Sequence, residues 1–427
     1  MKWFVACYVL FISLSSRPIY GADSGWVRHP SHTSSNLRGV SFSDANTWIA
    51  VGDGGTIVRS TDGGGVWSTL PSPVGDHLRG VSFRGNVGVA VGLAGRVLRS
   101  TDSGANWIQE TRPTSRNLYA VSIGASFAVI TGEEGTILVS TDTGQTWSPR
   151  TAGTASILFG VSIFGPTAVG VGGQATAVNS VDTGGGWGLE VLGPTQQLFF
   201  YGISLVSATT GWAVGSYAPT GSIIIKSTNS GFTWGVQSAP TTNILFGVAF
   251  ASADSGTAVG FNGTIVHTTN GGIDWTNQES NTLQALNAVA FVNAHTGIAV
   301  GDSGTILRTT NGGLTDVEQQ SAQTVPSEFR LEQNYPNPFN PTTVIRYQVP
   351  TPGGVEGSGA SHVRLAVFDL LGREVSVLVN EQKAAGRHEV TFNASGLSSG
   401  IYLYRLEVRA EAQGATFSST KRLVLLR

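Results

Sequence analysis

The sequence predicts an all-β protein in which a seven-bladed β-propeller is followed by an immunoglobulin-like β-sandwich. Three observations predict this fold. A unit of about 40 residues occurs seven times, 57 glycines and ten tryptophans occur among the 427 residues, and the C-terminal part alternates apolar and polar side chains. A period of this length, with several short strands in each unit, is typical of propeller blades.

Residues 1–22 are expected to be a secretory signal peptide. Lys2 is followed by the apolar run WFVACYVLFISL and then by SSRPIYGA, which gives a basic start, a short apolar segment and a small residue at the end. The run is shorter than the roughly 20 residues needed to cross a bilayer, so no transmembrane segment is expected. Cys7, the only cysteine, lies within this segment, which excludes disulfides and thiolate metal sites from the exported chain.

Seven copies of a turn motif lie between residues 60 and 316. Successive Trp residues of these motifs are 40, 40, 40, 47 and 41 positions apart, and the seventh copy has Asp316 where the others have Trp. Each motif is preceded by segments rich in Val, Ile and aromatic residues, so each unit is expected to form four short strands separated by glycine turns. The copies are STDGGGVW (60–67), STDSGANW (100–107), STDTGQTW (140–147), SVDTGGGW (180–187), STNSGFTW (227–234), TTNGGIDW (268–275) and TTNGGLTD (309–316).

The N-terminal segment is expected to complete the seventh blade. In five of the six complete units, the Trp precedes the first segment of the next unit by 11 residues, and Trp26 precedes Leu37 by the same number. Trp26 is therefore expected to take the position that Asp316 leaves vacant. Because such a ring has no unpaired first or last blade, we expect one closed propeller over residues 23–316.

These motifs match the Asp-box family, and the array resembles the propellers of Ycf48/Hcf136-like photosystem II assembly factors. It is more distantly similar to sialidase-type and BNR-repeat propellers. In all these families the boxes build a turn, so the resemblance implies an architecture and leaves several activities open. Three functions stay open: an exported binding or scaffolding module, a secreted sialidase-like glycoside hydrolase, and a photosystem II assembly or stability factor.

A second module is expected after a polar linker at 317–328. Alternating segments such as VRLAVFDL and IYLYRLEV indicate half-buried antiparallel strands, and about 100 residues suit a sandwich. The runs QNYPNPFNP, DLLGREV, AGRHEV and GLSSGIYLYRL, with the basic end, resemble the type A sorting domain of type IX secretion over 329–427. The resemblance implies a Bacteroidetes-type host, passage through the periplasm, contact with the type IX secretion machinery, and delivery to the cell surface or medium.

One position of the repeat is the best candidate for a binding site. The second residue of each inner-strand segment is expected to lie near the mouth of the central channel, where the seven copies would form a ring. Two arginines beside four aromatic residues suit a peptide or a sugar, through stacking and cation–π contacts, and packing at blade edges is the alternative. The ring residues are Arg38, Arg79, Tyr119, Phe159, Tyr201, Phe246 and Asn287.

Two further repeat positions carry charge. Asp53, Glu133 and Asp302 follow a turn glycine, and we expect solvated turns there in preference to an acid–base or cation site. A basic position directly before the boxes is expected to make contacts at blade edges. Its members are Arg59, Arg99, Lys226, His267 and Arg308.

Charge and composition exclude other classes of function. A net charge of −2 gives no electrostatic reason to expect binding to nucleic acid. No arginine cluster with a nucleophile and an acid is recognisable, so no enzyme activity, catalytic residue, metal or cofactor is expected. The expected function is that of an exported, non-catalytic propeller that binds a protein or glycan ligand.

Overall fold

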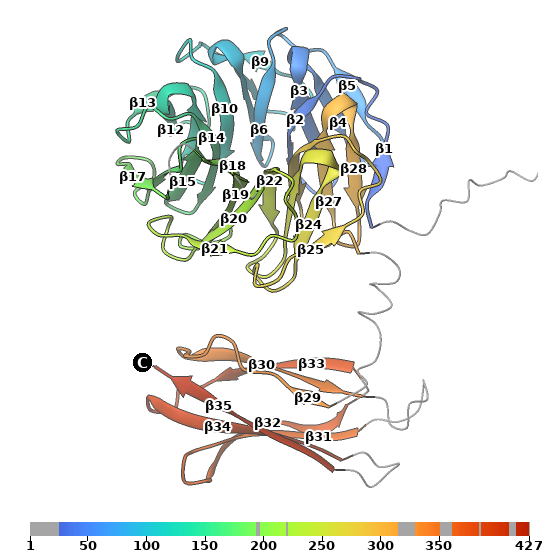
Figure 1. Ribbon diagram of the computed structural model, residues 1–427, viewed down its shortest axis with the longest axis vertical. Coiled ribbons are helices and arrows are strands. Elements are labelled where there is room, and N and C mark those ends of the chain that lie inside the picture. The colour runs from blue at the N-terminus through green and yellow to red at the C-terminus, as the bar shows by residue number, and fades with distance from the viewer. Residues whose placement is uncertain are drawn as a thin grey trace, which may run out of the picture. The chain divides into compact units, whose positions relative to one another are not determined.

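The computed structural model describes residues 25–193, 197–218, 221–314, 329–350, 361–383, 386–409 and 416–426. The expected signal peptide at 1–22 and the linker at 317–328 lie outside these ranges. The chain divides into two compact units, Met1–Val317 and Glu318–Arg427. Within the described residues, the first unit contains seven four-stranded antiparallel sheets arranged as a ring (Figure 1), and the second contains two sheets. The predicted fold class is confirmed.

Each blade is a meander whose first strand lies innermost. Blade 1 consists of β2 (Leu37–Phe42), β3 (Trp48–Gly52), β4 (Ile57–Ser60) and β5 (Ser68–Leu70), paired in that order. Blades 2, 3 and 4 are β6 (Leu78–Arg84), β7 (Val87–Gly92), β8 (Val97–Ser100) and β9 (Ile108–Gln109); β10 (Leu118–Ile123), β11 (Ala128–Gly132), β12 (Ile137–Ser140) and β13 (Ser148–Arg150); and β14 (Leu158–Phe164), β15 (Thr167–Gly172), β16 (Thr176–Ser180) and β17 (Gly188–Val191).

The remaining blades follow the same order. They are β18 (Leu198–Leu205), β19 (Gly211–Tyr217), β20 (Gly221–Ser227) and β21 (Gly235–Gln237) in blade 5; β22 (Leu245–Phe250), β23 (Gly256–Gly260), β24 (Ile265–Thr268) and β25 (Thr276–Gln278) in blade 6; and β26 (Leu286–Phe291), β27 (Gly297–Gly301), β28 (Ile306–Thr309) and β1 (Val27–His29) in blade 7. Short 3-10 turns join the second and third strands of five blades: η1 (Asp53–Gly55), η2 (Leu93–Gly95), η3 (Glu133–Gly135), η4 (Phe261–Gly263) and η5 (Asp302–Gly304).

The ring is closed by β1, which pairs antiparallel with β28 and places Val27 opposite Arg308. Trp26 is 1% exposed and packs in the core of blade 7 with Leu286 and Leu307. Its ring meets Phe291 edge-on, with centroids 5.9 Å apart, and its indole N–H donates to Gln278 Oε1 at 2.8 Å. The pairing confirms the strand position that the spacing of Trp26 predicts.

The Asp boxes are turns held by their own side chains. In blade 1, Asp62 Oδ1 accepts the hydroxyl of Ser60 at 2.7 Å and the backbone N–H of Val66 at 2.9 Å. The indole of Trp67 donates to the carbonyl of Gly64 at 3.0 Å, and Gly64 has φ 88°, a region that favours glycine. The boxes therefore stabilise the hairpins through hydrogen bonds within the turn.

The basic position before the boxes joins neighbouring blades. Arg59 Nε donates to the carbonyl of Ser103 at 3.0 Å, and Arg99 Nε donates in the same way to Thr143 in the next box. Arg308 Nε donates to the carbonyl of Gly63 at 2.7 Å, across the point where the ring closes. These cations occupy structural positions at blade edges.

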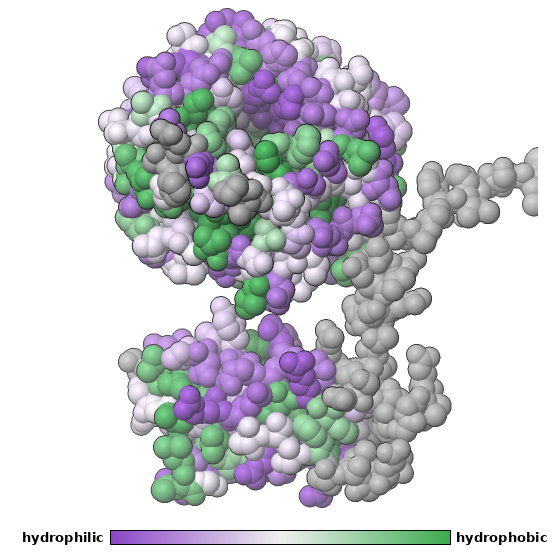
Figure 2. Space-filling view, viewed as in Figure 1, coloured by the Kyte–Doolittle hydropathy of each residue, from purple (hydrophilic) through white to green (hydrophobic). Residues whose placement is uncertain are grey.

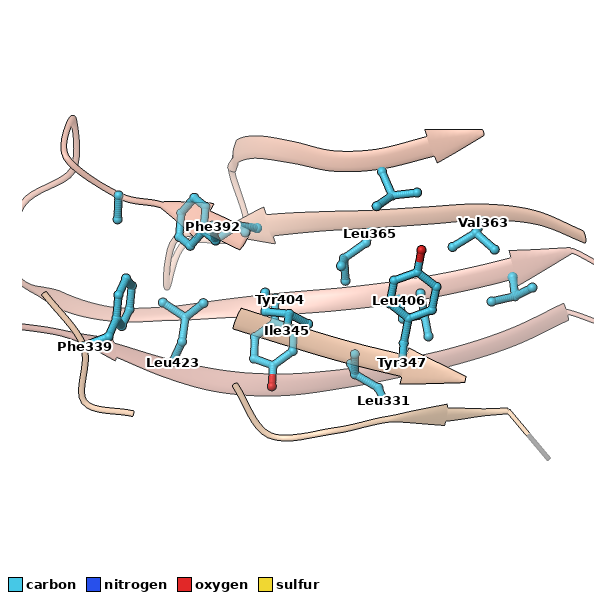
Figure 3. Packing of buried hydrophobic residues seen from close by; sticks show 14 of the residues in the cluster. Leu331, Phe339, Ile345, Tyr347, Val363, Leu365, Phe392, Tyr404, Leu406 and Leu423 are labelled. Carbon is cyan, nitrogen blue, oxygen red and sulfur yellow. The ribbon is translucent and has the colours of Figure 1, made fainter. Parts of the chain in front are cut away.

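The C-terminal unit is a sandwich of two sheets. One sheet contains β29 (Arg330–Leu331), β30 (Thr342–Val349) and β33 (Gly386–Asn393), and the other contains β32 (Glu374–Lys383), β31 (Ser361–Phe368), β34 (Gly400–Arg409) and β35 (Thr416–Leu425), in these orders. Ile345 and Tyr347 of the first sheet face Leu365 and Leu406 of the second (Figure 3). Burial raises the pKa of Tyr404 to about 12, and its hydroxyl donates to the carbonyl of Glu332 at 2.7 Å.

Candidate functional site: a ring at the channel mouth

Every ring residue is the extra residue of a β-bulge. In blade 1, Leu37 lies opposite Gly52 and Gly39 lies opposite Val51, so Arg38 between them has no partner across the ladder. The same shift between the first two strands occurs at the ring position of the other six blades. A bulge bends its strand and redirects the side chain. The seven bulges therefore present the seven ring side chains at equivalent places around the channel.

Small residues after the bulge allow the inner strands to crowd around the channel. A Cβ added to Gly202 would lie 2.8 Å from the carbonyl oxygen of Phe246 in the next blade, and one added to Gly160 would lie 2.9 Å from that of Tyr201. These separations are too short for any larger residue without movement of the backbone. Glycine at this position thus brings neighbouring ring residues within contact distance.

Four ring residues form a continuous aromatic arc, which we define as Tyr119, Phe159, Tyr201 and Phe246. The ring centroids are 5.3 Å apart from Tyr119 to Phe159, 5.3 Å from Phe159 to Tyr201, and 5.6 Å from Tyr201 to Phe246. Their planes are tilted or edge-on, which is the arrangement that aromatic quadrupoles favour. All four side chains are partly exposed. The arc is thus an accessible apolar surface over blades 3 to 6.

The other three ring residues form a charged arc, which we define as Arg38, Arg79 and Asn287. Arg38 contacts two carboxylates, Asp53 at 3.0 Å and Asp302 at 3.1 Å. Asn287 donates to the same Asp302 oxygen at 2.9 Å. The carboxylates come from the turns η1 and η5, so they link the ring residues of blades 7, 1 and 2 into one network.

Asp53 and Asp302 lie in partly exposed turns, as expected, and in addition they pair with ring residues. Burial alone would raise the pKa of Asp53, but hydrogen bonds from Arg38 and Asn36 and the nearby charges of Arg38 and Arg79 outweigh it and lower the pKa. In blade 3, Glu133 accepts the hydroxyl of Tyr119 at 3.0 Å. Burial, and then Glu133, raise the pKa of this tyrosine, so its hydroxyl keeps its proton.

Arg79 is less fully paired than Arg38, although its side chain is exposed to a similar extent, 27% against 25%. Its shortest contact to a carboxylate is 3.5 Å, from NH1 to Asp53, and its Nε is buried without a hydrogen-bond partner in the described structure. A guanidinium carries five N–H donors in a fixed planar arrangement. Arg79 also lies close enough to Tyr119 to lower the pKa of its phenol in part. The ring therefore holds an available cation where the charged and aromatic arcs meet.

The structure thus brings the predicted ring residues together in two sets of contacts, from Asn287 through Arg38 to Arg79 and from Tyr119 to Phe246. Asp53 and Asp302 are the members of the site that the sequence assigned to another role. Among the described residues, no group of three or more His, Cys, Asp or Glu side chains is arranged to hold a metal ion. No helix within the described ranges is long and apolar enough to cross a membrane.

Comparisons with known proteins agree with this architecture. Residues 21–164 and 226–315, more than half of the chain, match the family described as photosynthesis system II assembly factor YCF48. Residues 333–424 match the secretion system C-terminal sorting domain, which indicates secretion to the cell surface or medium. No curated protein matches the chain.

Several solved propellers have a similar fold. A structure of YCF48 bound to D1 peptide is 20% identical, covers 68% of this chain and 98% of its own, and has a TM-score of 0.56. YCF48 from Cyanidioschyzon merolae is also 20% identical, with 66% and 98% coverage and a TM-score of 0.55. The WD40 propeller of Doa1 is 10% identical, with 67% and 97% coverage and a TM-score of 0.55. The protein is a secreted member of the YCF48 propeller family that carries a C-terminal sorting domain.

Proposed function

We propose that this protein is an exported, non-catalytic propeller that binds an extended peptide across the ring. The observation that carries the proposal is the junction of the two arcs, where the Arg79 guanidinium is 27% exposed, has one ion pair of 3.5 Å, to Asp53, and lies near enough to the Tyr119 hydroxyl to act on its pKa. An arginine binds a carboxylate through two parallel hydrogen bonds, and aromatic faces bind apolar side chains. A peptide with an acidic group followed by apolar residues suits both halves of the ring.

A solved relative supports a peptide as the ligand, since a YCF48 propeller has been captured with a peptide of D1. A glycan is the second candidate, because the aromatic arc offers rings on which a sugar would stack. A photosystem II assembly role is disfavoured for this chain because the sorting domain directs it out of the cell.

The first experiment measures binding of the full chain to arrays of peptides about ten residues long, each with a free or an amidated C-terminus, and to a glycan array. The tightest acidic peptide is then titrated by calorimetry. We expect Arg79→Gln to weaken its binding at least tenfold. Arg84→Gln removes the same charge from the exposed far end of the same strand and is the matched control. Equal binding by Arg79→Gln and the native chain would contradict the peptide site.

A hydrolysis assay with a fluorogenic sialoside tests the catalytic alternative. The hydroxyl of Tyr201 lies 3.4 Å from that of Ser216, and neither group is paired with a carboxylate in the described contacts. We therefore expect no turnover. Turnover that Tyr201→Phe abolishes, with the melting temperature unchanged, would establish a sialidase-like enzyme instead.

We further propose that a signal peptide at 1–22 takes the chain to the periplasm and that residues 329–427 then direct it to the type IX machinery. In this organisation the propeller occupies 23–316 and a linker occupies 317–328. Expression in a host with type IX secretion tests the route. The full chain should reach the surface or the medium, whereas a chain that ends at residue 328 should accumulate in the periplasm. Export of both chains would overturn the role of the C-terminal module.

A further inference from the structure

Blade 5 departs from an otherwise regular repeat. Eight residues separate Gly215 from Ile224, whereas four separate the equivalent Gly52 and Ile57 of blade 1. The added residues lengthen β19 and β20 to seven residues each, where β4 has four. Insertions in one unit of a repeat protein commonly build its binding surface. The other blades take part in the closed ring without these added residues. The insertion is therefore expected to have another role.

The added residues line a cavity instead of filling the space between blades 4 and 5. This inter-blade cavity has a volume of about 230 Å³, and all its lining side chains are apolar or aromatic. Tyr217 and Ile223 come from the lengthened hairpin, and Leu198 comes from the early start of β18. Trp234 of the box forms part of the wall. A cavity of about 150 Å³ with apolar walls is enough to hold benzene. The inter-blade cavity is larger and therefore suits an aromatic ligand larger than benzene.

The mouth of the cavity leaves apolar surface in water. Val236, in the outer strand β21, lines the cavity and is 76% exposed. Figure 2 shows hydrophobic surface where Figure 1 places β20 and β21. β21 ends the sheet of blade 5, and among the described strands none pairs with its outer edge. A ligand that covers Val236 would remove this apolar surface from water.

A second, more polar cavity adjoins the first. It has a volume of about 420 Å³ and shares Tyr217, Ile223 and Val236 with it. Ser222, Thr241 and Gln237 bring polar side chains to its wall. The Ser222 hydroxyl donates to the Thr241 carbonyl, the Thr241 hydroxyl accepts the N–H of Asn243, and the Gln237 amide donates to the Gly271 carbonyl, so each keeps a further lone pair or proton for a ligand. Ligand sites typically combine an apolar body with a few polar groups that fix orientation. The two cavities together therefore match a ligand with an apolar ring and a hydrogen-bonding substituent.

We propose that the inter-blade cavity of blades 4 and 5 binds an aromatic ring that carries a neutral hydrogen-bonding group. Such a group occurs in small phenols and indoles and in the Tyr or Trp side chains of a peptide. This site is separate from the ring at the channel mouth, because it is lined by β20 and β21 and contains none of the seven ring residues.

Calorimetric titration of the full chain with 4-ethylphenol and with N-acetyltryptophanamide tests the proposal. We expect at least one of the two to bind, and Val236→Asp, which places a charge at the mouth, to weaken it at least tenfold. Val66→Asp is the matched control, since Val66 is a comparably exposed valine (68%) on blade 1. Tighter binding of the tryptophan amide would indicate a peptide side chain as the source, and tighter binding of the phenol would indicate a free aromatic molecule.

Three results would overturn the proposal. They are the failure of both probes to bind the native chain, unchanged binding by Val236→Asp, and equal losses in Val236→Asp and Val66→Asp. Size-exclusion chromatography supplies a further check, because a native dimer that Val236→Asp converts to a monomer would make this face a contact between two copies. Thermal melting of both variants confirms that they are folded, and both substituted side chains are largely in solvent already.

Discussion

Arg38 and Asp302 are 264 residues apart in sequence, yet their side chains meet at 3.1 Å across the point where the ring closes. Arg38 belongs to the first blade and Asp302 to the turn η5 of the last. The charged arc is therefore assembled only when the N-terminal strand β1 has joined β28 and the ring is complete. Closure of the fold and formation of the charged arc are therefore the same structural event.

Trp26→Ala is expected to destabilise the propeller by about 3–5 kcal/mol, since it removes a fully buried indole from the core of the closing blade. It also breaks the hydrogen bond to Gln278, which in turn donates to the carbonyl of Gly312. Urea denaturation followed by circular dichroism measures the loss. Val27→Ala, in the same short strand but 44% exposed, should cost well under a third as much. Similar losses for the two variants would contradict the closing role of Trp26.

The sequence predicts the blades and the ring position well because both depend on local requirements that recur. Each box needs an Asp or Asn, a glycine and a Trp, so the same letters return at six of the seven copies, and the spacing of Trp26 identifies the missing strand. The ring follows because equivalent residues occupy equivalent places in a closed array. The sorting domain is recognisable for a similar reason, since its turns depend on short local motifs.

The contacts between blades cannot be predicted from the sequence of a single repeat, because each depends on two repeats at once. Arg38 and Asp302 look like independent strand and turn residues of two distant repeats, and only the closed ring brings them to 3.1 Å. The shortage of partners at Arg79 is likewise a result of where Asp53 lies. The cavity of blade 5 arises from the way inserted apolar residues pack, which composition alone does not determine.

Gly202→Ala is expected to destabilise the propeller by about 1–3 kcal/mol through overpacking between blades 5 and 6. The new methyl group would lie 2.8 Å from the carbonyl of Phe246 and 3.0 Å from the Cα of Gly247, and both neighbours are backbone atoms of an inner strand. Gly75→Ala is the control, because a Cβ at Gly75 meets no atom within 4 Å. Chemical denaturation gives the free energy of unfolding of both variants. If Gly202→Ala unfolds with the same free energy as the native chain, the inner strands are not crowded at this position.

The Asp boxes should make stability depend on pH in acid. Burial alone would raise the pKa of Asp102, but hydrogen bonds from Asn106 and Ser100 outweigh it and lower the pKa to about 2. The unfolded chain, with a value near 3.8, therefore takes up the proton first as the pH falls. This contribution is fully present above about pH 5 and is lost progressively as the pH falls towards 2.

Asp102→Asn tests this pH dependence, because Asn229 forms the same box in blade 5 without a titrating group and accepts the N–H of Thr233 at 2.9 Å. Free energies of unfolding measured between pH 5 and pH 2 should fall less steeply for Asp102→Asn than for the native chain. The reverse change, Asn229→Asp, should steepen the fall. Parallel curves for all three proteins would show that the boxes do not contribute to acid unfolding.

Arg38 and Arg79 occupy the same repeat position, so a comparison of the two separates a structural role from a binding role. Arg38→Ala removes contacts to Asp53 and Asp302 and should cost about 1–2 kcal/mol, between the values of a surface and a buried ion pair. Arg79→Ala should cost less than about 1 kcal/mol, because its single ion pair is long and its Nε has no partner to lose. Thermal melts and calorimetry with the acidic peptide measure both properties. We expect Arg38→Ala to lose more stability than Arg79→Ala, and Arg79→Ala to lose peptide binding with nearly full stability. If Arg79→Ala instead loses stability as Arg38→Ala does, Arg79 is a packing residue and the ring has no free cation to offer a ligand.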